Sequence, residues 1–268
     1  MRIVDQGHGV PIVLIPGIQG RWEYMRPAVD ALAVHFRVVT FSLCDEPQSG
    51  LRFDSALGMD AYANQVMAAL DACGLRRAII CGVSFGGLIA LRCAARHPDR
   101  SSALILASTP GPRWHIEPKH ERYSKRPWLF GPLFLAESPS RLREEIAIAI
   151  PDRETRRRFM RAQVKTLVTA PLSPSRLASR ARLIGAYDRV ADAARVTCPT
   201  LVLHGEPHLD HVVPVAGSTE YAQLIPGTRV ERLPETGHLG TVTRPELFAR
   251  AVRQFAESAH HHTHDSAA

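Results

Sequence analysis

One serine stands between two glycines where a buried strand is predicted to give way to a helix. Residues 82–86 read Gly-Val-Ser-Phe-Gly, with the largely apolar residues 77–81 before them and the apolar residues 87–91 after them. So sharp a turn strains the backbone of the serine, and the flanking glycines keep side chains out of the tight contact. The turn exposes the hydroxyl of Ser84 and aims the first N–H groups of the helix at whatever binds there. Ser84 is therefore a candidate nucleophile.

Short apolar runs alternate with helical segments along the chain and would position this serine. Strands are predicted at residues 11–15, 37–42, 77–81, 103–107, 199–204 and 229–233, and helices at residues 24–35, 59–73, 87–96, 141–150, 154–168, 218–224 and 245–257. Runs that are apolar throughout are typical of strands buried on both faces. The alternation predicts an α/β fold, with a mostly parallel sheet and helices on both faces.

The alternation is interrupted once, by a long helical stretch rich in arginine and proline. Because strands resume after it, we interpret residues 1–110 and 196–257 as one core and residues 111–195 as an inserted helical lid. Residues 258–268 include four histidines and are expected to form a disordered tail.

The positive charge of the chain is concentrated in this insertion. The chain has 33 Lys and Arg against 26 Asp and Glu, and the segment Arg113 to Arg195 holds fifteen arginines and three lysines against nine acids. Such a segment would suit nucleic acid, an anionic membrane or an acidic substrate, but no aromatic residues alternate with the charges, so we interpret it as solvated helical surface. Arg153, Arg157 and Arg161 share one helical face, which would favour acidic acyl substrates if it faced the site.

Cysteine usage and the lack of targeting segments indicate a cytoplasmic protein. The five cysteines are odd in number, lie in apolar segments and lack C-x-x-C spacing, which is typical of reduced, buried thiols. The first residues are charged where a signal peptide needs an apolar run, and no stretch approaches the length of a membrane span.

Four motifs, taken in order, resemble those of the α/β-hydrolase family. They are Pro-Gly-Ile-Gln-Gly at residues 16–20, the turn at Ser84, Asp-His-Val-Val-Pro at residues 210–214 and Thr-Gly-His at residues 236–238. Serine, then acid, then histidine is the chain order of that family. The resemblance covers residues 3–257 and implies the α/β-hydrolase fold with a serine nucleophile.

A serine hydroxyl reacts once a base takes its proton, and a third group must hold that base in one tautomer. His238 is the candidate base, because it follows the last predicted strand and Gly237 permits a turn over the carboxyl edge of the sheet. The resemblance implies Asp210 as the orienting acid, four residues before Pro214. Glu206 is its rival, because Asp210 lies two residues further from the preceding glycine than is common in the family.

Two backbone N–H groups are expected to stabilise the oxyanion of the reacting carbonyl. The resemblance implies that these belong to Ile18, in the segment after the first strand, and to Phe85, which follows the nucleophile. The family's segment usually begins with His-Gly, whereas this one begins with Pro16-Gly17. The donor is a backbone amide, so the change leaves it in place, although Pro16-Gly17 alone also fits a simple turn.

A short stretch with His204, His208, Asp210 and His211 raises the alternative of a metal site. Tetrahedral zinc needs ligands that converge from a rigid frame, whereas these residues lie in one loop whose aspartate already has a role, so we expect no metal. The chain has no G-x-G-x-x-G or P-loop pattern, and we expect no cofactor.

These residues together predict a cofactor-independent serine hydrolase that cleaves a carboxylic ester or a related acyl bond through an acyl-enzyme. Members of the family also include thioesterases, lactonases, carbon–carbon bond hydrolases, haloperoxidases and acyltransferases, which the fold does not separate. Dehalogenases and epoxide hydrolases use an aspartate nucleophile, against which Ser84 argues. The alternative outside enzymes is a non-catalytic receptor on the same fold. The expected partner is a small-molecule acyl substrate, with no nucleic acid and no membrane span.

Overall fold

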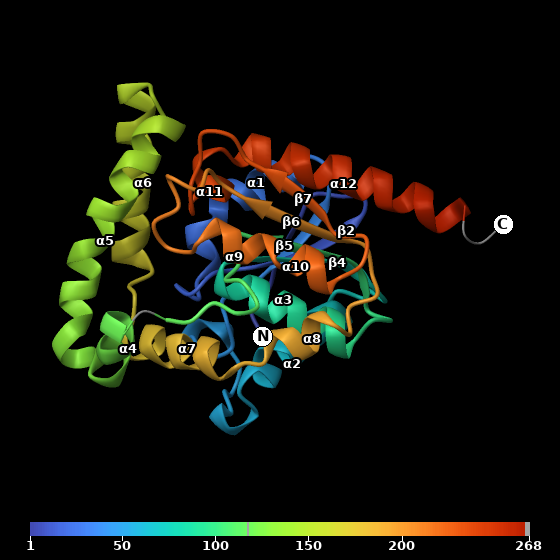
Figure 1. Cartoon of the computed structure of the whole chain (residues 1–268), viewed down its shortest axis with the longest axis horizontal. Coiled ribbons are helices and arrows are strands. Elements are labelled where there is room, and N and C mark those ends of the chain that lie inside the picture. Colours follow the sequence, from blue (N-terminus) through green and yellow to red (C-terminus); the bar gives the residue numbers. More distant parts are fainter. Residues whose placement is uncertain (117, 266–268) are drawn as a thin grey trace.

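Seven strands form one sheet, in the order β1-β3-β2-β4-β5-β6-β7, in the computed structural model of the protein, which describes residues 1–116 and 118–265 (Figure 1). The strands are β1 (Val4–Gln6), β2 (Pro11–Ile15), β3 (Arg37–Thr40), β4 (Ala78–Val83), β5 (Ser101–Ala107), β6 (Thr200–His204) and β7 (Arg229–Arg232). Neighbours from β3 to β7 run parallel, whereas β1 lies antiparallel to β3 at the edge. The predicted α/β fold with a mostly parallel sheet is confirmed.

Helices cover both faces of this sheet, with α1 and α12 on one side and α2 and α3 on the other (Figure 1). The helices that lie between or after the strands are α1 (Arg26–Ala33), α2 (Met59–Ala72), α3 (Phe85–Arg96), α9 (Val215–Thr219), α10 (Tyr221–Leu224), α11 (Gly240–Thr243) and α12 (Pro245–Asp265). Short 3-10 helices span Trp22–Met25, Pro47–Ser49 and Ser55–Leu57. The helix α12 continues past Glu257, where the sequence predicted its end, and residues 266–268 of the expected tail lie outside the described residues.

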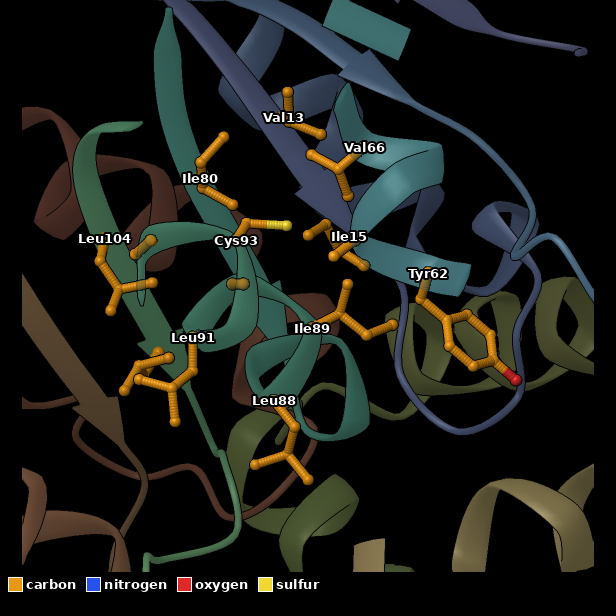
Figure 2. Close-up of a cluster of buried hydrophobic side chains, with 14 of the residues drawn as sticks. Val13, Ile15, Tyr62, Val66, Ile80, Leu88, Ile89, Leu91, Cys93 and Leu104 are labelled. Atoms are coloured by element: carbon orange, nitrogen blue, oxygen red, sulfur yellow. The ribbon is translucent and has the colours of Figure 1, made fainter. Parts of the chain in front are cut away.

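The apolar side chains of the strands alternate between two cores, because successive residues of a strand point to opposite faces. Ile12 and Leu14 of β2 pack with side chains of α1 and α12. Val13 and Ile15 of the same strand pack with those of α2 and α3, and Figure 2 shows both beside Val66 of α2. The central strands are buried on both faces, as their continuous apolar runs predicted.

The long stretch between β5 and β6 folds as helices. They are α4 (Pro118–Lys125), α5 (Pro127–Ala149), α6 (Arg153–Thr169), α7 (Pro174–Ala186) and α8 (Arg189–Ala193). Of these, α4, α5 and α6 lie at one end of the sheet, whereas α7 leads back to α8, which lies beside α3 (Figure 1). We call residues 111–195 the inserted segment. Its helix α5 begins at Pro127, well before the predicted residue 141. It includes the prolines at positions 132 and 138, although proline usually ends a helix.

All five cysteines lie in the described part of the chain, and all are free thiols. Within residues 1–116 and 118–265, no helix combines the length and the apolar character that crossing a bilayer requires.

Arg180 of α7 attaches the inserted segment to the core through a buried charge cluster. Its side chain is 1% exposed and donates to Asp45 Oδ1 at 2.7 Å and to Glu46 Oε1 at 2.6 Å. It also donates to the carbonyl of Ile18 at 2.8 Å. Arg176, one turn earlier on α7, donates to the same oxygen of Glu46 at 3.0 Å. Two of the arginines that the sequence presented as solvated surface therefore have partners in the core.

Replacing Arg180 by methionine is expected to lower the free energy of unfolding by about 3–5 kcal/mol, because Asp45 and Glu46 would stay buried without their main cation. The matched control is Arg158→Met, which breaks an exposed pair with Glu154 on α6 and should cause no measurable change. Chemical denaturation followed by circular dichroism compares the two variants. Equal losses would contradict a special role for the buried cluster.

Candidate active site

Ser84 occupies a strained turn between β4 and α3. Its φ is 55° and its ψ is −118°, in the left-handed region of φ that residues with a side chain rarely adopt. Such a conformation costs on the order of 1–3 kcal/mol and persists only where its surroundings hold it. The N–H of Ser84 donates to the carbonyl of Ala107 at 2.8 Å, and its carbonyl accepts from Gly87 N–H at 2.9 Å. The predicted sharp turn is therefore present, and it is held from both sides.

The glycines that flank this turn are required by the close approach of three backbone segments. A Cβ atom on Gly82 would lie 2.0 Å from the carbonyl oxygen of Gly86. A Cβ atom on Gly86 would lie 2.3 Å from the carbonyl oxygen of Ile15, at the end of β2. No side chain fits at either position, so the strand ends and the first turn of α3 fix where Ser84 stands.

His238 lies in the loop between β7 and α11 and bridges the other two predicted residues. Its Nε2 lies 3.1 Å from Ser84 Oγ, and its Nδ1 lies 3.2 Å from Asp210 Oδ2. An ionised carboxylate can only accept, so Nδ1 donates to Asp210 and leaves Nε2 to accept the proton of the Ser84 hydroxyl. The structure thus joins the three residues in one chain of hydrogen bonds.

Asp210 is held ionised in the loop after β6. Its Oδ1 accepts the N–H groups of Val212 at 3.0 Å and Val213 at 2.9 Å. Burial alone would raise the pKa of Asp210, but the charge and hydrogen bond of His238 and these two N–H groups outweigh burial and hold the pKa below its usual value. Burial lowers the pKa of His238 in turn, but the charge and hydrogen bond of Asp210, together with the charge of Glu145, outweigh burial, so that the pKa of His238 is raised.

The rival acid, Glu206, lies away from His238 and accepts from Arg232 at 3.2 Å. The two extra residues between the strand and Asp210 are absorbed by a tight turn, because the N–H groups of Leu209 and Asp210 both donate to the carbonyl of Glu206, at 3.0 and 3.1 Å. The turn brings Asp210 back to the edge of the sheet. The structure therefore brings Asp210, and not Glu206, to the histidine.

The three histidines of the alternative metal site have separate surroundings. His204 Nδ1 is hydrogen-bonded to the carbonyl of Gly205 at 2.7 Å, and the side chains of His208 and His211 are exposed. Within the ranges that the structure describes, no three ligand-type side chains gather as a metal site.

Both segments predicted to supply oxyanion donors lie against Ser84. A Cβ atom on Gly17 would lie 3.5 Å from the Cβ of Ser84, so the loop that carries Ile18 passes directly beside Ser84. Arg180 holds this loop by the carbonyl of Ile18. Phe85 is the first residue of α3, and its N–H is one of the four at a helix start that have no partner within the helix.

The face of α6 that carries Arg153, Arg157 and Arg161 is exposed to solvent. The half-buried side of this helix includes Arg156 and Phe159 instead, and Arg156 donates to the carbonyl of residue 150 at 2.8 Å. A preference for acidic acyl groups through the Arg157 face, considered from the sequence, therefore has no structural basis.

Sequence reasoning missed Glu145, a fully buried carboxyl on α5. Its Oε1 accepts from the N–H of Leu239, next to His238, at 2.6 Å. A signal was present, since Glu145 stands at helical spacing from the apolar Leu142 and Ala149 and beside Ile146, on the face that is buried. A carboxyl on the apolar side of a helix needs a partner elsewhere in the fold.

Comparison with known proteins gives the family. The sequence model described as "Alpha/beta hydrolase family" matches residues 12–251. The 2-hydroxymuconate semialdehyde hydrolase of Pseudomonas putida is 26% identical over 269 residues, which cover 95% of this chain and 90% of the relative. The pimeloyl-(acyl-carrier protein) methyl ester esterase of Nitrosomonas europaea is 24% identical over 262 residues, covering 92% and 96% of the two chains. The enol-lactonase from Burkholderia xenovorans LB400 has the same fold, with a TM-score of 0.78 and 23% identity over 96% of each chain. This protein therefore belongs to the alpha/beta hydrolase family.

Proposed function

We propose that this protein is a serine hydrolase that cleaves a carboxylic ester or a related acyl bond through an acyl-enzyme. The observation that carries the proposal is the continuous chain of hydrogen bonds from Asp210 through His238 to Ser84, with links of 3.2 and 3.1 Å. A nucleophile next to a base that is itself oriented by an acid is the recurring arrangement of enzymes that transfer acyl groups.

In the first step Ser84 Oγ attacks the carbonyl carbon of the substrate while His238 Nε2 takes the hydroxyl proton. Asp210 holds the ring in the tautomer that leaves Nε2 free and stabilises the imidazolium that forms. The carbonyl oxygen becomes negatively charged and is stabilised by the N–H groups of Ile18 and Phe85. His238 then gives its proton to the leaving alkoxide, and the alcohol departs from the acyl-enzyme.

In the second step a water molecule attacks the carbonyl carbon of the acyl-enzyme. His238 takes one proton from this water, and the same two N–H groups stabilise the oxyanion. The bond to Ser84 Oγ then breaks, and Oγ recovers its proton from His238. The carboxylic acid leaves, and the enzyme returns to its starting state.

The names of the relatives include hydrolases of several substrate classes, esters among them. One relative is named as a methyl ester esterase and a structural neighbour as an enol-lactonase. A further relative is named as a 2-hydroxymuconate semialdehyde hydrolase, so members of the family differ in substrate.

We also propose that the inserted segment, residues 111–195, is a lid over this site. Its helix α5 contacts the loop of His238 through Glu145, and its helix α7 contacts the loop of Ile18 through Arg180. Inserted helices that touch catalytic loops on both sides of a site are suited to gate it and to exclude water.

Replacing Ser84 by alanine is expected to lower kcat/KM for an aryl acetate by about 10³-fold or more, because the nucleophile is lost while packing is retained. Labelling by a fluorophosphonate should occur in the wild type and disappear in this variant. Ser55→Ala, at an exposed serine, is the matched control and should keep both. A receptor without catalysis would give neither turnover nor labelling, and residual activity within about tenfold of the wild type would contradict the assignment of Ser84.

Replacing Asp210 by asparagine is expected to lower kcat/KM by about 10⁴-fold, because the wrong tautomer of His238 is then favoured. Without the carboxylate, burial should also lower the pKa of His238, which NMR titration of the ring would detect. Glu206→Gln, which breaks only the pair with Arg232, should change neither quantity by more than a few-fold. The opposite ranking of the two variants would reassign the acid.

A further inference from the structure

The carboxyl of Glu145, on α5 of the inserted segment, contacts the loop that carries His238. Besides the 2.6 Å hydrogen bond from Leu239 N–H, it packs directly on Gly237. A Cβ atom on Gly237 would lie 2.9 Å from the carboxyl carbon of Glu145 and 2.4 Å from the carbonyl oxygen of Leu209. The loop of the base is therefore held between the loop of Asp210 and the side chain of Glu145.

The second carboxyl oxygen of Glu145 is not used by the fold. Its Oε2 is buried and has no hydrogen-bond partner among the residues that the structure describes. Burial raises the pKa of Glu145 to about 6, against the opposing influence of the Gly237 and Leu239 N–H groups and of His238. A buried carboxylate needs a cation or further donors nearby. His238 is the neighbouring group that becomes a cation during the proposed reaction.

In the described part of the chain, charged groups lie near Glu145 on α5 and on the loops packed against it, and Arg141 stands one turn earlier on α5. His238 and Asp210 face it from the loops after β7 and β6. On α5 itself, Glu144 is exposed and lies 3.9 Å from His211. Arg244, at the end of α11, donates to the carbonyl of Ala149, one turn after Glu145 on α5. Arg244 also pairs with Glu235. Among these described groups, His238 is the one that gains its positive charge during the proposed reaction, and that charge acts on Glu145.

We propose that Glu145 is a positioning residue for His238, which fixes the loop of the base and adds a second negative charge that stabilises its imidazolium form. The inference rests on the proposed function, because an imidazolium forms during turnover only if His238 takes the proton of Ser84. Asp210 acts on the ring through a hydrogen bond, whereas Glu145 acts through the Leu239 N–H and through its charge. The inserted segment thereby contributes to the chemistry as well as covering the site.

The charge of Glu145 has a definite effect on the pH dependence of activity. Ionised Glu145 raises the pKa of His238, and the free enzyme is active when His238 is neutral. Removing the charge should therefore move the acid limb of kcat/KM to lower pH. It should also lower the plateau, because the imidazolium is then stabilised less in the transition state. A contact that is only structural would lower the plateau and leave the limb where it is.

The test is Glu145→Gln, assayed with an aryl acetate between about pH 5 and pH 9. The amide oxygen keeps the bond to Leu239 N–H, and we expect a plateau lowered about tenfold and an acid limb lower by about one pH unit. Glu144→Gln removes a carboxylate from the adjacent exposed position of α5 and should change neither. Glu145→Met, an apolar side chain of similar shape, should give the same shift of the limb with a larger loss of plateau.

An unchanged limb in both Glu145 variants would overturn the proposal, whether or not the plateau falls. NMR titration of the His238 ring in the wild type and in Glu145→Gln measures the same shift without an assay. If the wild type neither hydrolyses the ester nor reacts with a fluorophosphonate, the proposed function fails, and the inference fails with it even where the ring pKa shifts. If Ser84 is reactive and the ring pKa is unchanged, the inference alone fails.

Discussion

Three backbone segments meet at the Ser84 turn too closely for any side chain to stand between them, and the rest of the site depends on this contact. Gly82 pairs with Ile15 across β4 and β2, and Gly86 in the first turn of α3 lies on the carbonyl of the same Ile15. The register that buries Ile15 in the core therefore also fixes where Ser84, the proposed nucleophile, stands. Strain at Ser84, on the order of 1–3 kcal/mol, is held by burial of the two cores on either side of the sheet.

The loops of Asp210 and His238 are held by contacts of the same kind. A Cβ atom on Gly205 would lie 2.4 Å from the carbonyl of Gly237, and one on Gly237 would lie 2.4 Å from the carbonyl of Leu209. The inserted segment adds two buried charges to this frame, Arg180 on the loop of Ile18 and Glu145 on the loop of His238. Backbone packing thus sets the approximate positions of Ser84, Asp210 and His238, and charged side chains from α5 and α7 hold the loops on both sides of Ser84.

The features that could be predicted from the sequence are those that depend on local interactions. The buried strands and the turn at Ser84 were predicted because apolar runs and flanking glycines mark them directly. The edge strand β1 was missed, since its three residues hold a single apolar side chain. Glu145 and Arg180 were not recognised as contacts of the site, because a charged residue on an arginine-rich helix is usually solvated and only tertiary pairing explains its burial. The tight turn from Glu206 to Asp210 was also hidden, since two inserted residues do not reveal whether a loop lengthens or coils.

The charged groups of the site act on stability in opposite directions as pH changes. The pKa of Asp210 is lowered, so its contribution is present above the unfolded value and is lost as pH falls through the folded one. The pKa of Glu145 is raised from 4.5 to about 6, so its ionisation opposes folding by about 2 kcal/mol as pH rises across that interval. An apolar residue at position 145 would avoid this cost. The Leu239 N–H needs one acceptor oxygen, which an amide would also supply. The fold therefore does not account for the charge of Glu145, whereas the proposed imidazolium of His238 does.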